Sequence, residues 1–144
     1  PELWVSKWVT TGTRRIIVHV ESMRDFEVIR TAVPQGIIEL GLAINNATPI
    51  TELEKYIDRI DFVQFMGIDR IGFQGQPFDE RVLDRVRGLR TAFPELPISI
   101  DGSVNKNTAK RLVDAGATRL VAGSAILESG DVHSAMEELK SLVE

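Results

Sequence analysis

The chain has 144 residues, with seventeen basic and twenty-one acidic side chains, a net charge of −4 and no cysteine. The charges form no blocks, so nucleic acid and acidic membrane surfaces are not expected partners, and no apolar run approaches the roughly 20 residues of a membrane-spanning helix. The lack of cysteine excludes disulfides and thiolate metal sites. We therefore expect a single cytoplasmic domain over residues 1–144, without a membrane segment.

The first part of the chain alternates between helix and strand signals. Helical spacing of apolar residues predicts a helix over residues 2–9, and the β-branched run that follows predicts a buried parallel strand over residues 14–20. Helical spacing returns over residues 25–33, and a second strand is predicted over residues 37–44. Thr48, with a proline directly after it, is typical of the cap and first turn of the next helix.

The second part of the chain continues the alternation. Strands are predicted at residues 61–68, 98–101 and 119–123. Helices are predicted over residues 79–93, from a cap at Asn105 to a stop at Gly116, and after a cap at Asp131. Asp79 is expected on the outward face of its helix. The last helix is expected to turn one apolar face inward, made of Val132, Ala135, Met136, Leu139 and Val143.

Strands and helices thus alternate five times at spacings of about 25 residues, which is typical of βαβ units on a parallel sheet. Two architectures share this pattern. A doubly wound open sheet would carry a glycine-rich nucleotide fingerprint after its first strand, and none follows Val20. A (β/α) barrel has eight strands and about 250 residues, so five strands would make a partial barrel.

Two short turns follow the fourth and fifth strands. The first, IDGSVN, places Gly102 and Ser103 after Asp101, and the second, VAGSAI, contains Gly123 and Ser124. In such barrels phosphate commonly binds at the turns after the last two strands, where glycine allows a close backbone approach and free N–H groups face the anion. The N–H and hydroxyl of Ser103 would add donors. Each turn alone is compatible with a plain tight turn, and the two together predict a phosphate site.

Three ionisable side chains stand near strand ends. Asp101 ends the fourth strand, where its carboxylate could hold a divalent cation or exchange a proton with a substrate; the alternative is a turn cap. His19 and Glu21 share one face of the first strand, as a metal pair would. Two ligands do not make a site, so we expect His19 to be satisfied by its neighbours.

The loop from Met66 to Phe78 contains three glycines, Phe73 and two glutamines. Loops of about a dozen residues in compact domains are often binding loops. Its N–H groups could cover a bound phosphosugar, and the alternative is a flexible connection.

Several motifs together resemble the ribulose-phosphate 3-epimerase family. They are GLAIN with TP, GFQGQPF, LR, IDGSVN and DAGATRLVAGSAI (residues 41–45, 48–49, 72–78, 89–90, 100–105 and 114–126). The combination is specific, whereas the DG and GSAI turns alone recur in other phosphate-binding barrels. The resemblance covers the whole chain and corresponds to the C-terminal part of the family barrel. It implies a TIM (β/α)8 fold of the ribulose-phosphate binding type, present here as a partial barrel of about five parallel strands.

The same resemblance implies an isomerase of the pentose phosphate pathway. Its reaction would interconvert D-ribulose 5-phosphate and D-xylulose 5-phosphate by metal-assisted two-base proton transfer at carbon 3. Asp101 matches a catalytic residue and metal ligand, Met66 a substrate-lining methionine, and His19 a histidine that is not a metal ligand. The matched substrate- and phosphate-binding residues are Gly72, Phe73, Gln74, Gly75, Gly102, Ser103, Gly123 and Ser124. The cofactor would be a divalent cation (Zn, Fe, Mn or Mg), the partner a pentulose phosphate or similar small phosphosugar, and the assembly a homo-oligomer.

The chain departs from the family motifs at four places. GFQG stands for GFGG, DGSV for DGGV, Asn46 for a proline, and Arg70 with Ile71 for another proline. The family's second aspartate, two metal histidines and first-strand serine have no counterpart here, so we expect the 144 residues alone to be inactive in the complete two-base epimerisation. Two alternatives stay open: another phosphosugar-binding barrel, similar to hexulose-phosphate synthases and decarboxylases, or a non-catalytic partial barrel that acts by binding or self-assembly.

Overall fold

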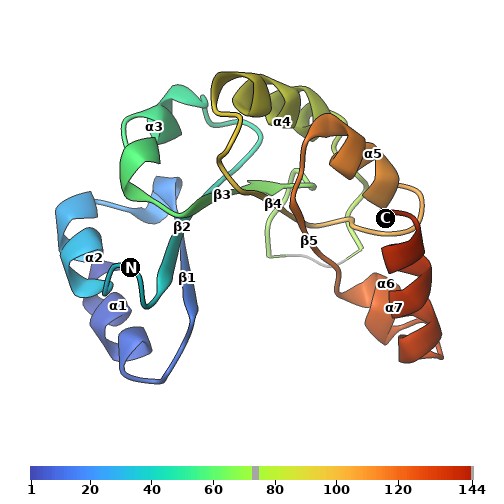
Figure 1. Ribbon diagram of the computed structural model, residues 1–144, viewed down its shortest axis with the longest axis horizontal. Helices are drawn as coiled ribbons and strands as arrows, with labels where there is room; N and C mark the ends of the chain where they lie inside the picture. Colours follow the sequence, from blue (N-terminus) through green and yellow to red (C-terminus); the bar gives the residue numbers. More distant parts are fainter. Residues whose placement is uncertain (73–74, 144) are drawn as a thin grey trace.

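A computed structural model of the protein describes residues 1–72 and 75–143. The strands in this part of the chain are β1 (Arg15–His19), β2 (Glu39–Ile44), β3 (Phe62–Met66), β4 (Ile98–Asp101) and β5 (Arg119–Val121). The helices are α1 (Glu2–Val9), α2 (Phe26–Ala32), α3 (Thr51–Glu54), α4 (Arg81–Ala92), α5 (Ala109–Ala115), α6 (Ser124–Leu127) and α7 (Val132–Ser141), with 3₁₀ turns η1 (Val20–Ser22) and η2 (Ile57–Arg59). The strands follow an arc, and helices α1 to α5 lie along its outer side (Figure 1).

The sheet is parallel throughout, and its order β1-β2-β3-β4-β5 follows the chain. In a doubly wound sheet the order of the strands reverses at a switch point. Strands that are added one after another in the same direction along an arc build a barrel wall. The predicted partial barrel is therefore confirmed. Within the described ranges, no helix has the length and apolarity needed to cross a bilayer.

The helix ends show why these residues form these elements. The side chain of Asp25 accepts hydrogen bonds from the N–H groups of Glu27 and Val28 at the start of α2, and Asp131 accepts one from Ser134 at the start of α7. Gly116 ends α5 in the left-handed conformation at φ 116°, which favours glycine. The predicted cap at Asp131 and the predicted stop at Gly116 are thus confirmed.

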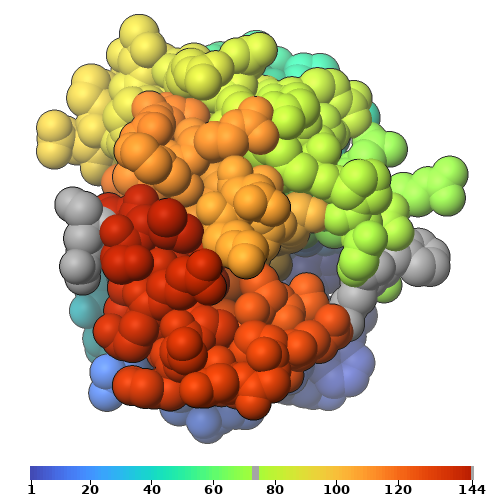
Figure 2. Space-filling model, turned by 90° about the vertical axis from the view of Figure 1, so that its right-hand side faces the viewer, coloured from blue at the N-terminus to red at the C-terminus, as the bar shows by residue number. Residues whose placement is uncertain are grey.

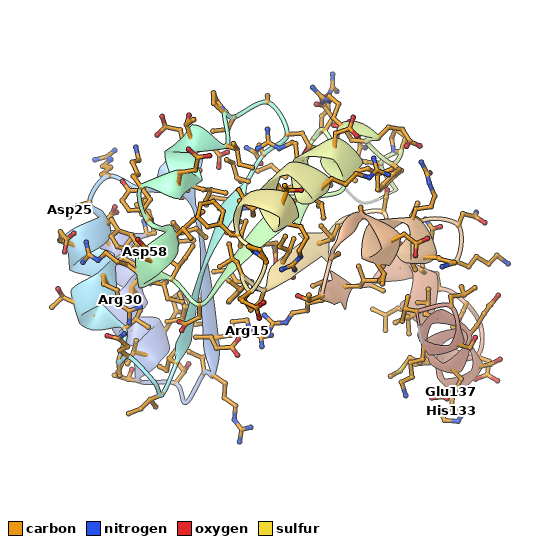
Figure 3. The ribbon with its side chains drawn as sticks, turned by 45° about the horizontal axis from the view of Figure 1, so that its top comes forward. Arg15, Asp25, Arg30, Asp58, His133 and Glu137 are labelled. Atoms are coloured by element: carbon orange, nitrogen blue, oxygen red, sulfur yellow. The ribbon has the colours of Figure 1, made fainter. Side chains whose placement is uncertain are left out.

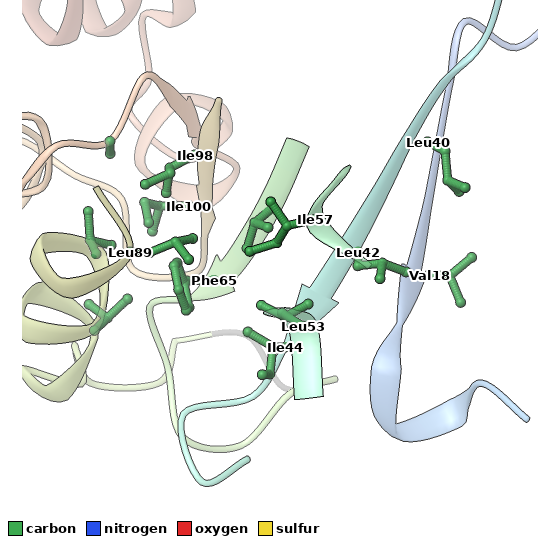
Figure 4. Close-up of a cluster of buried hydrophobic side chains, with 14 of the residues drawn as sticks. Val18, Leu40, Leu42, Ile44, Leu53, Ile57, Phe65, Leu89, Ile98 and Ile100 are labelled. Atoms are coloured by element: carbon green, nitrogen blue, oxygen red, sulfur yellow. The ribbon is translucent and has the colours of Figure 1, made fainter. Parts of the chain in front are cut away.

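The main core lies between the outer face of the sheet and the helices. Side chains alternate across a strand, so every second strand residue points outward. Leu42 of β2 and Phe65 of β3 are fully buried beneath the helices, where Leu53 and Leu89 meet them (Figure 4). The other outward-facing strand residues of this core are Ile16, Val18, Leu40, Ile44, Val63, Ile98 and Ile100.

A charged and aromatic cluster fills part of the inner, concave face. The Phe62 ring covers Gly41, since a Cβ atom there would lie 2.2 Å from a ring carbon. The guanidinium groups of Arg15 and Arg119 lie 5.4 and 4.8 Å from the centre of the Phe62 ring, and both also contact the Glu39 carboxylate. Arg15 extends from β1 toward the concave side (Figure 3). The cluster links β1 and β5, the two outermost strands of the arc.

Glu39→Gln is expected to destabilise the protein slightly at neutral pH. A hydrogen bond from Arg15, helped by the charges of Arg15 and Arg119, keeps the pKa of Glu39 below its usual value. A lowered folded-state pKa stabilises the fold above the unfolded-state pKa, and this contribution is lost as the pH falls through the folded-state pKa. Because the pair is partly exposed, we expect a cost of about 0.5–1 kcal/mol near pH 7.

Urea unfolding of both proteins near pH 7 and again in strong acid checks the Glu39 prediction. The difference between them should vanish in acid. A difference of the same size at both pH values would show that the charge of Glu39 is not the cause.

Several predictions about the limits of elements are wrong. Asn105 does not cap α5: its side-chain oxygen accepts from the Asn107 N–H at 2.9 Å, and α5 begins only at Ala109. Thr48 does not cap a helix: its hydroxyl donates to Glu21 Oε1 at 2.6 Å, and α3 begins only at Thr51. The second strand also begins two residues later than predicted, because the N–H groups of Ile37 and Ile38 donate hydrogen bonds to the Pro34 carbonyl in a turn.

The predicted inward face of α7 is not buried. Val132 and Met136 are 45% and 40% exposed, and no described residue of α7 is buried. The helix packs on α6, which leaves an apolar cavity of about 760 Å³ between α7 and β5. Figure 2 views this side, with α6 and α7 in orange-red and red. An amphipathic pattern identifies the face that seeks apolar cover and does not say what covers it.

Candidate functional site

The carboxyl ends of β3, β4 and β5 meet at one pocket on the inner side of the arc. The strand register pairs Met66 with Asp101 and Asp101 with Val121, so the three side chains lie on one face at one level. A pocket of about 670 Å³ opens there. It is lined by Met66, Ile68, Gly72, Gly75, Gln76, Asp101, Gly102, Ser103, Val104, Asn105, Val121, Gly123, Ser124, Ala125 and Glu128. The structure thus brings together every predicted site residue that it describes; Phe73 and Gln74 lie outside the described residues.

The glycine-bearing loop after β3 begins and ends at this pocket. The Gly67 N–H donates to the Asp101 carbonyl at 2.7 Å, and the Gly67 carbonyl accepts from the Asp79 N–H at 2.9 Å. A Cβ atom on Gly67 would lie 2.0 Å from the carbonyl oxygen of Gly102. Glycine at position 67 therefore allows the loop to leave β3 directly against the first turn.

A buried polar network holds the end of the loop, and the sequence did not reveal it. Asp79 was predicted to face outward, but its side chain is only 10% exposed. Its carboxylate accepts hydrogen bonds from Asn46 Nδ2 and Arg81 Nε, each at 2.9 Å, and Asn46 Nδ2 also donates to the Met66 carbonyl. Hydrogen bonding by Arg81 is the main cause that keeps the pKa of Asp79 below its usual value. The only signal in the sequence was Asn46, which stands where the resembled family has proline.

The turn after β4, which is the first of the two glycine turns, contains two residues with positive φ. Gly102 and Ser103 have φ of 102° and 51°, and the Ser103 carbonyl accepts hydrogen bonds from Asn105 Nδ2 and Thr108 Oγ1. The Ser103 hydroxyl donates to the carbonyl of Gln76 at 2.6 Å. That hydroxyl was predicted to be a donor for phosphate, and in the structure it serves the loop instead. An anion at this turn would then be bound through main-chain N–H groups, of which that of Gly102 also contacts the Asp101 carboxylate.

The second turn leads into α6, and Gly123 precedes this short helix without a side-chain cap. The first N–H groups of a helix have no carbonyl partner within it. Among the described residues that line the pocket there are two carboxylates, Asp101 and Glu128, and no lysine, arginine or histidine. The two carboxylates would repel an anion bound here, so its binding would depend on main-chain N–H groups and on neutral side-chain donors.

Asp101 is an ionisable group of the pocket with a shifted pKa. Its side chain is half-buried, and burial raises its pKa above the usual value, against smaller opposing effects of the Gly102 N–H and of His19. A carboxyl group with a raised pKa is a better proton acceptor and releases the proton less readily. Such a group at the mouth of a pocket is suited to proton exchange with a bound ligand.

Comparison with known proteins assigns the chain to a family. Residues 1–127 match the sequence profile of the ribulose-phosphate 3 epimerase family. The chain belongs to this family. The ribulose-phosphate 3-epimerase of Aquifex aeolicus is 33% identical over 151 residues, covering 99% of this chain and 66% of the relative. That of Candida glabrata is 29% identical over 143 residues, covering 99% of this chain and 58% of the relative.

The chain thus spans 58–66% of the length of these two relatives. Solved structures agree in fold. A 3-hexulose-6-phosphate synthase superposes with a TM-score of 0.77 at 21% identity, over 99% of this chain and 68% of that one. KGPDC from Streptococcus mutans superposes with a TM-score of 0.75 at 14% identity, over 99% of this chain and 66% of that one. At such identities the likeness concerns the barrel fold alone.

The divalent cation implied by the epimerase family does not find a complete set of ligands in the described residues. They contain no group of three or more histidine, aspartate or glutamate side chains that could hold a metal ion. His19 Nδ1 lies 3.3 Å from Glu21 Oε2, and the other oxygen of Glu21 accepts from the Asn45 N–H and the Thr48 hydroxyl. Glu21 therefore ties two loops together, which agrees with the expectation that neighbours satisfy His19. Of the metal ligands that the resemblance implies, Asp101 is the one present among the described residues.

Proposed function

We propose that this chain forms the phosphate-binding and proton-transferring part of an epimerase that interconverts D-ribulose 5-phosphate and D-xylulose 5-phosphate. One observation carries the proposal: Asp101 lines the same pocket as the two glycine turns. A phosphate group at the turns would anchor one end of a pentulose, and the carbon chain would extend toward the carboxylate. The phosphate-binding residues are then Gly102, Ser103, Gly123 and Ser124, through their main-chain groups, with Gly72 and Gly75 on the loop side and Met66 lining the pocket.

In the proposed reaction Asp101 removes the proton on carbon 3, next to the substrate carbonyl, and an enediolate results. Burial, which raises the pKa of Asp101, strengthens it as a base. Inversion requires that a proton return from the opposite face, so Asp101 accounts for one of the two proton transfers. The divalent cation implied by the family needs ligands besides Asp101, and we assign no step to it.

Proton exchange in heavy water tests the proposal. The protein is incubated with D-ribulose 5-phosphate in D₂O, and the sugar is followed by NMR. We expect deuterium at carbon 3, because one base is sufficient for exchange even where inversion does not follow. A sugar that neither exchanges at carbon 3 nor epimerises would contradict the proposal.

Glu128→Gln is expected to strengthen the binding of inorganic phosphate about two- to threefold. The described residues of the pocket wall carry two negative charges and no cation, and the substitution removes one of these charges. The effect should shrink at high salt, as for any solvent-exposed charge. Isothermal titration measures both, and Glu95→Gln, which alters an exposed carboxylate at the other end of β4, serves as the control. Weaker binding by Glu128→Gln would mean that Glu128 holds the ligand instead of repelling it.

A further inference from the structure

Ser103 adopts a backbone conformation that favours glycine. Among the residues that the structure describes, it is the only one other than glycine with a positive φ, at 51°. Side chains of L-residues are disfavoured there, and such residues persist only where their surroundings hold them in place. Here Asn105 Nδ2 and Thr108 Oγ1 hold the Ser103 carbonyl at 3.0 and 2.7 Å. The turn is thus fixed from the α5 side, independently of the Ser103 side chain.

The Ser103 side chain joins two walls of the pocket. Its hydroxyl donates to the carbonyl of Gln76 at 2.6 Å, and the bond is partly buried. Gln76 belongs to the segment that leads into α4, while Ser103 belongs to the turn after β4, and both residues line the pocket. A glycine at position 103 would adopt the same φ without strain and would lack this hydrogen bond. The unfavourable φ of Ser103 therefore coincides with a contact that only a hydroxyl side chain makes.

We propose that Ser103 is a positioning residue that fixes Gln76, and with it Gly75, beside the phosphate turn before a ligand binds. This inference rests on the proposed function for the identity of the ligand, a phosphosugar. The pocket wall formed by residues 75–77 would then need no ordering during binding, and preorganisation of this kind raises affinity because the ordering has already taken place. The phosphate itself is bound by main-chain N–H groups, since the Ser103 hydroxyl is engaged by Gln76.

Two substitutions separate this role from a general effect on stability. Ser103→Gly removes the hydroxyl and the strain together, so its melting temperature should equal or exceed that of the unchanged protein. Ser103→Ala removes the hydroxyl and keeps the strain, so it should melt at a lower temperature. Ser141→Ala, in the last turn of α7, removes a similar hydroxyl bond, to the Glu138 carbonyl at 2.8 Å, and is the matched control.

The first measurement is amide hydrogen exchange of residues 75–80 in the absence of ligand. Both Ser103 variants should exchange about fivefold faster there, as expected for the loss of one hydrogen bond, and Ser141→Ala should not. The second is the affinity for D-ribulose 5-phosphate, which should fall about fivefold in both Ser103 variants. The two variants are expected to differ in melting temperature. An effect on exchange and affinity that both share therefore cannot come from a change in overall stability.

If amide hydrogen exchange of residues 75–80 is no faster in Ser103→Gly, the inference is wrong. It is also wrong if this exchange is faster and the affinity for D-ribulose 5-phosphate stays the same. If the unchanged protein binds no phosphosugar, the proposed function fails. The exchange experiment, which needs no ligand, then decides by itself whether Ser103 positions Gln76.

Discussion

Asp101→Asn is expected to lower proton exchange at carbon 3 by about 10²- to 10⁴-fold, the range that one acid–base group contributes. Asparagine keeps the shape of the side chain and cannot accept the proton. The affinity for the phosphosugar should change little, because the main-chain groups of the two turns provide the phosphate contacts in the proposal. Exchange measured in D₂O and affinity measured by titration separate the two effects.

The same substitution should stabilise the protein near pH 7. Burial raises the folded-state pKa of Asp101, so folding favours the protonated carboxyl. That contribution is present in acid and is lost as the pH rises through the folded-state pKa. Asparagine stays neutral at every pH, so the melting temperature of Asp101→Asn should exceed that of the unchanged protein near pH 7 and match it in acid.

Asp84→Asn is the control for both effects. Its carboxylate lies on α4, is 88% exposed and pairs with Arg87 on the same helix. Exchange at carbon 3 should be unaffected. Full exchange activity in Asp101→Asn would remove Asp101 from the reaction.

Gly67→Ala is expected to destabilise the protein by about 1–3 kcal/mol, the usual cost of an overpacked site. The added Cβ atom would lie 2.0 Å from the Gly102 carbonyl oxygen, and a main-chain oxygen cannot rotate away as a flexible side chain can. Because Gly67 also donates to the Asp101 carbonyl, the first turn would be displaced with it. Phosphosugar binding should therefore weaken along with stability.

Gly88→Ala provides the matched comparison. Gly88 lies inside α4, and a Cβ atom there would meet nothing within 4 Å. Alanine favours the helix more than glycine does, so this variant should be more stable by about 0.5–1 kcal/mol. Urea unfolding of the two variants should give shifts of opposite sign. A Gly67→Ala protein as stable as Gly88→Ala would show that the first turn is not tightly packed against the loop.

The sequence predicted the elements because their signals are local. Alternation and helical spacing placed the five strands of the described residues within two residues of their ends, and Gly102 and Gly123 identified the turns at the carboxyl ends of β4 and β5. Asp101 could be predicted to lie at the mouth of the pocket because it ends a parallel strand, and all such strand ends meet at one edge.

Contacts between distant segments could not be predicted from local patterns. Asp79 falls on the polar face of an ideal helix, but α4 begins only at Arg81, and a partner 33 residues away, Asn46, draws the carboxylate inward. No local pattern connects Arg15 with Arg119, and the curvature of the sheet brings both to one phenylalanine ring. The Ser103 hydroxyl has an acceptor, Gln76, that no pattern along the chain identifies.

A crystal structure with D-ribulose 5-phosphate tests the central claim most directly. The account predicts that the phosphate lies within hydrogen-bonding reach of the main-chain N–H groups of the two turns, including that of Ser124, with carbon 3 next to the Asp101 carboxylate. A sugar phosphate bound elsewhere on the protein, and not in the pocket at the carboxyl ends of β3, β4 and β5, would contradict the account.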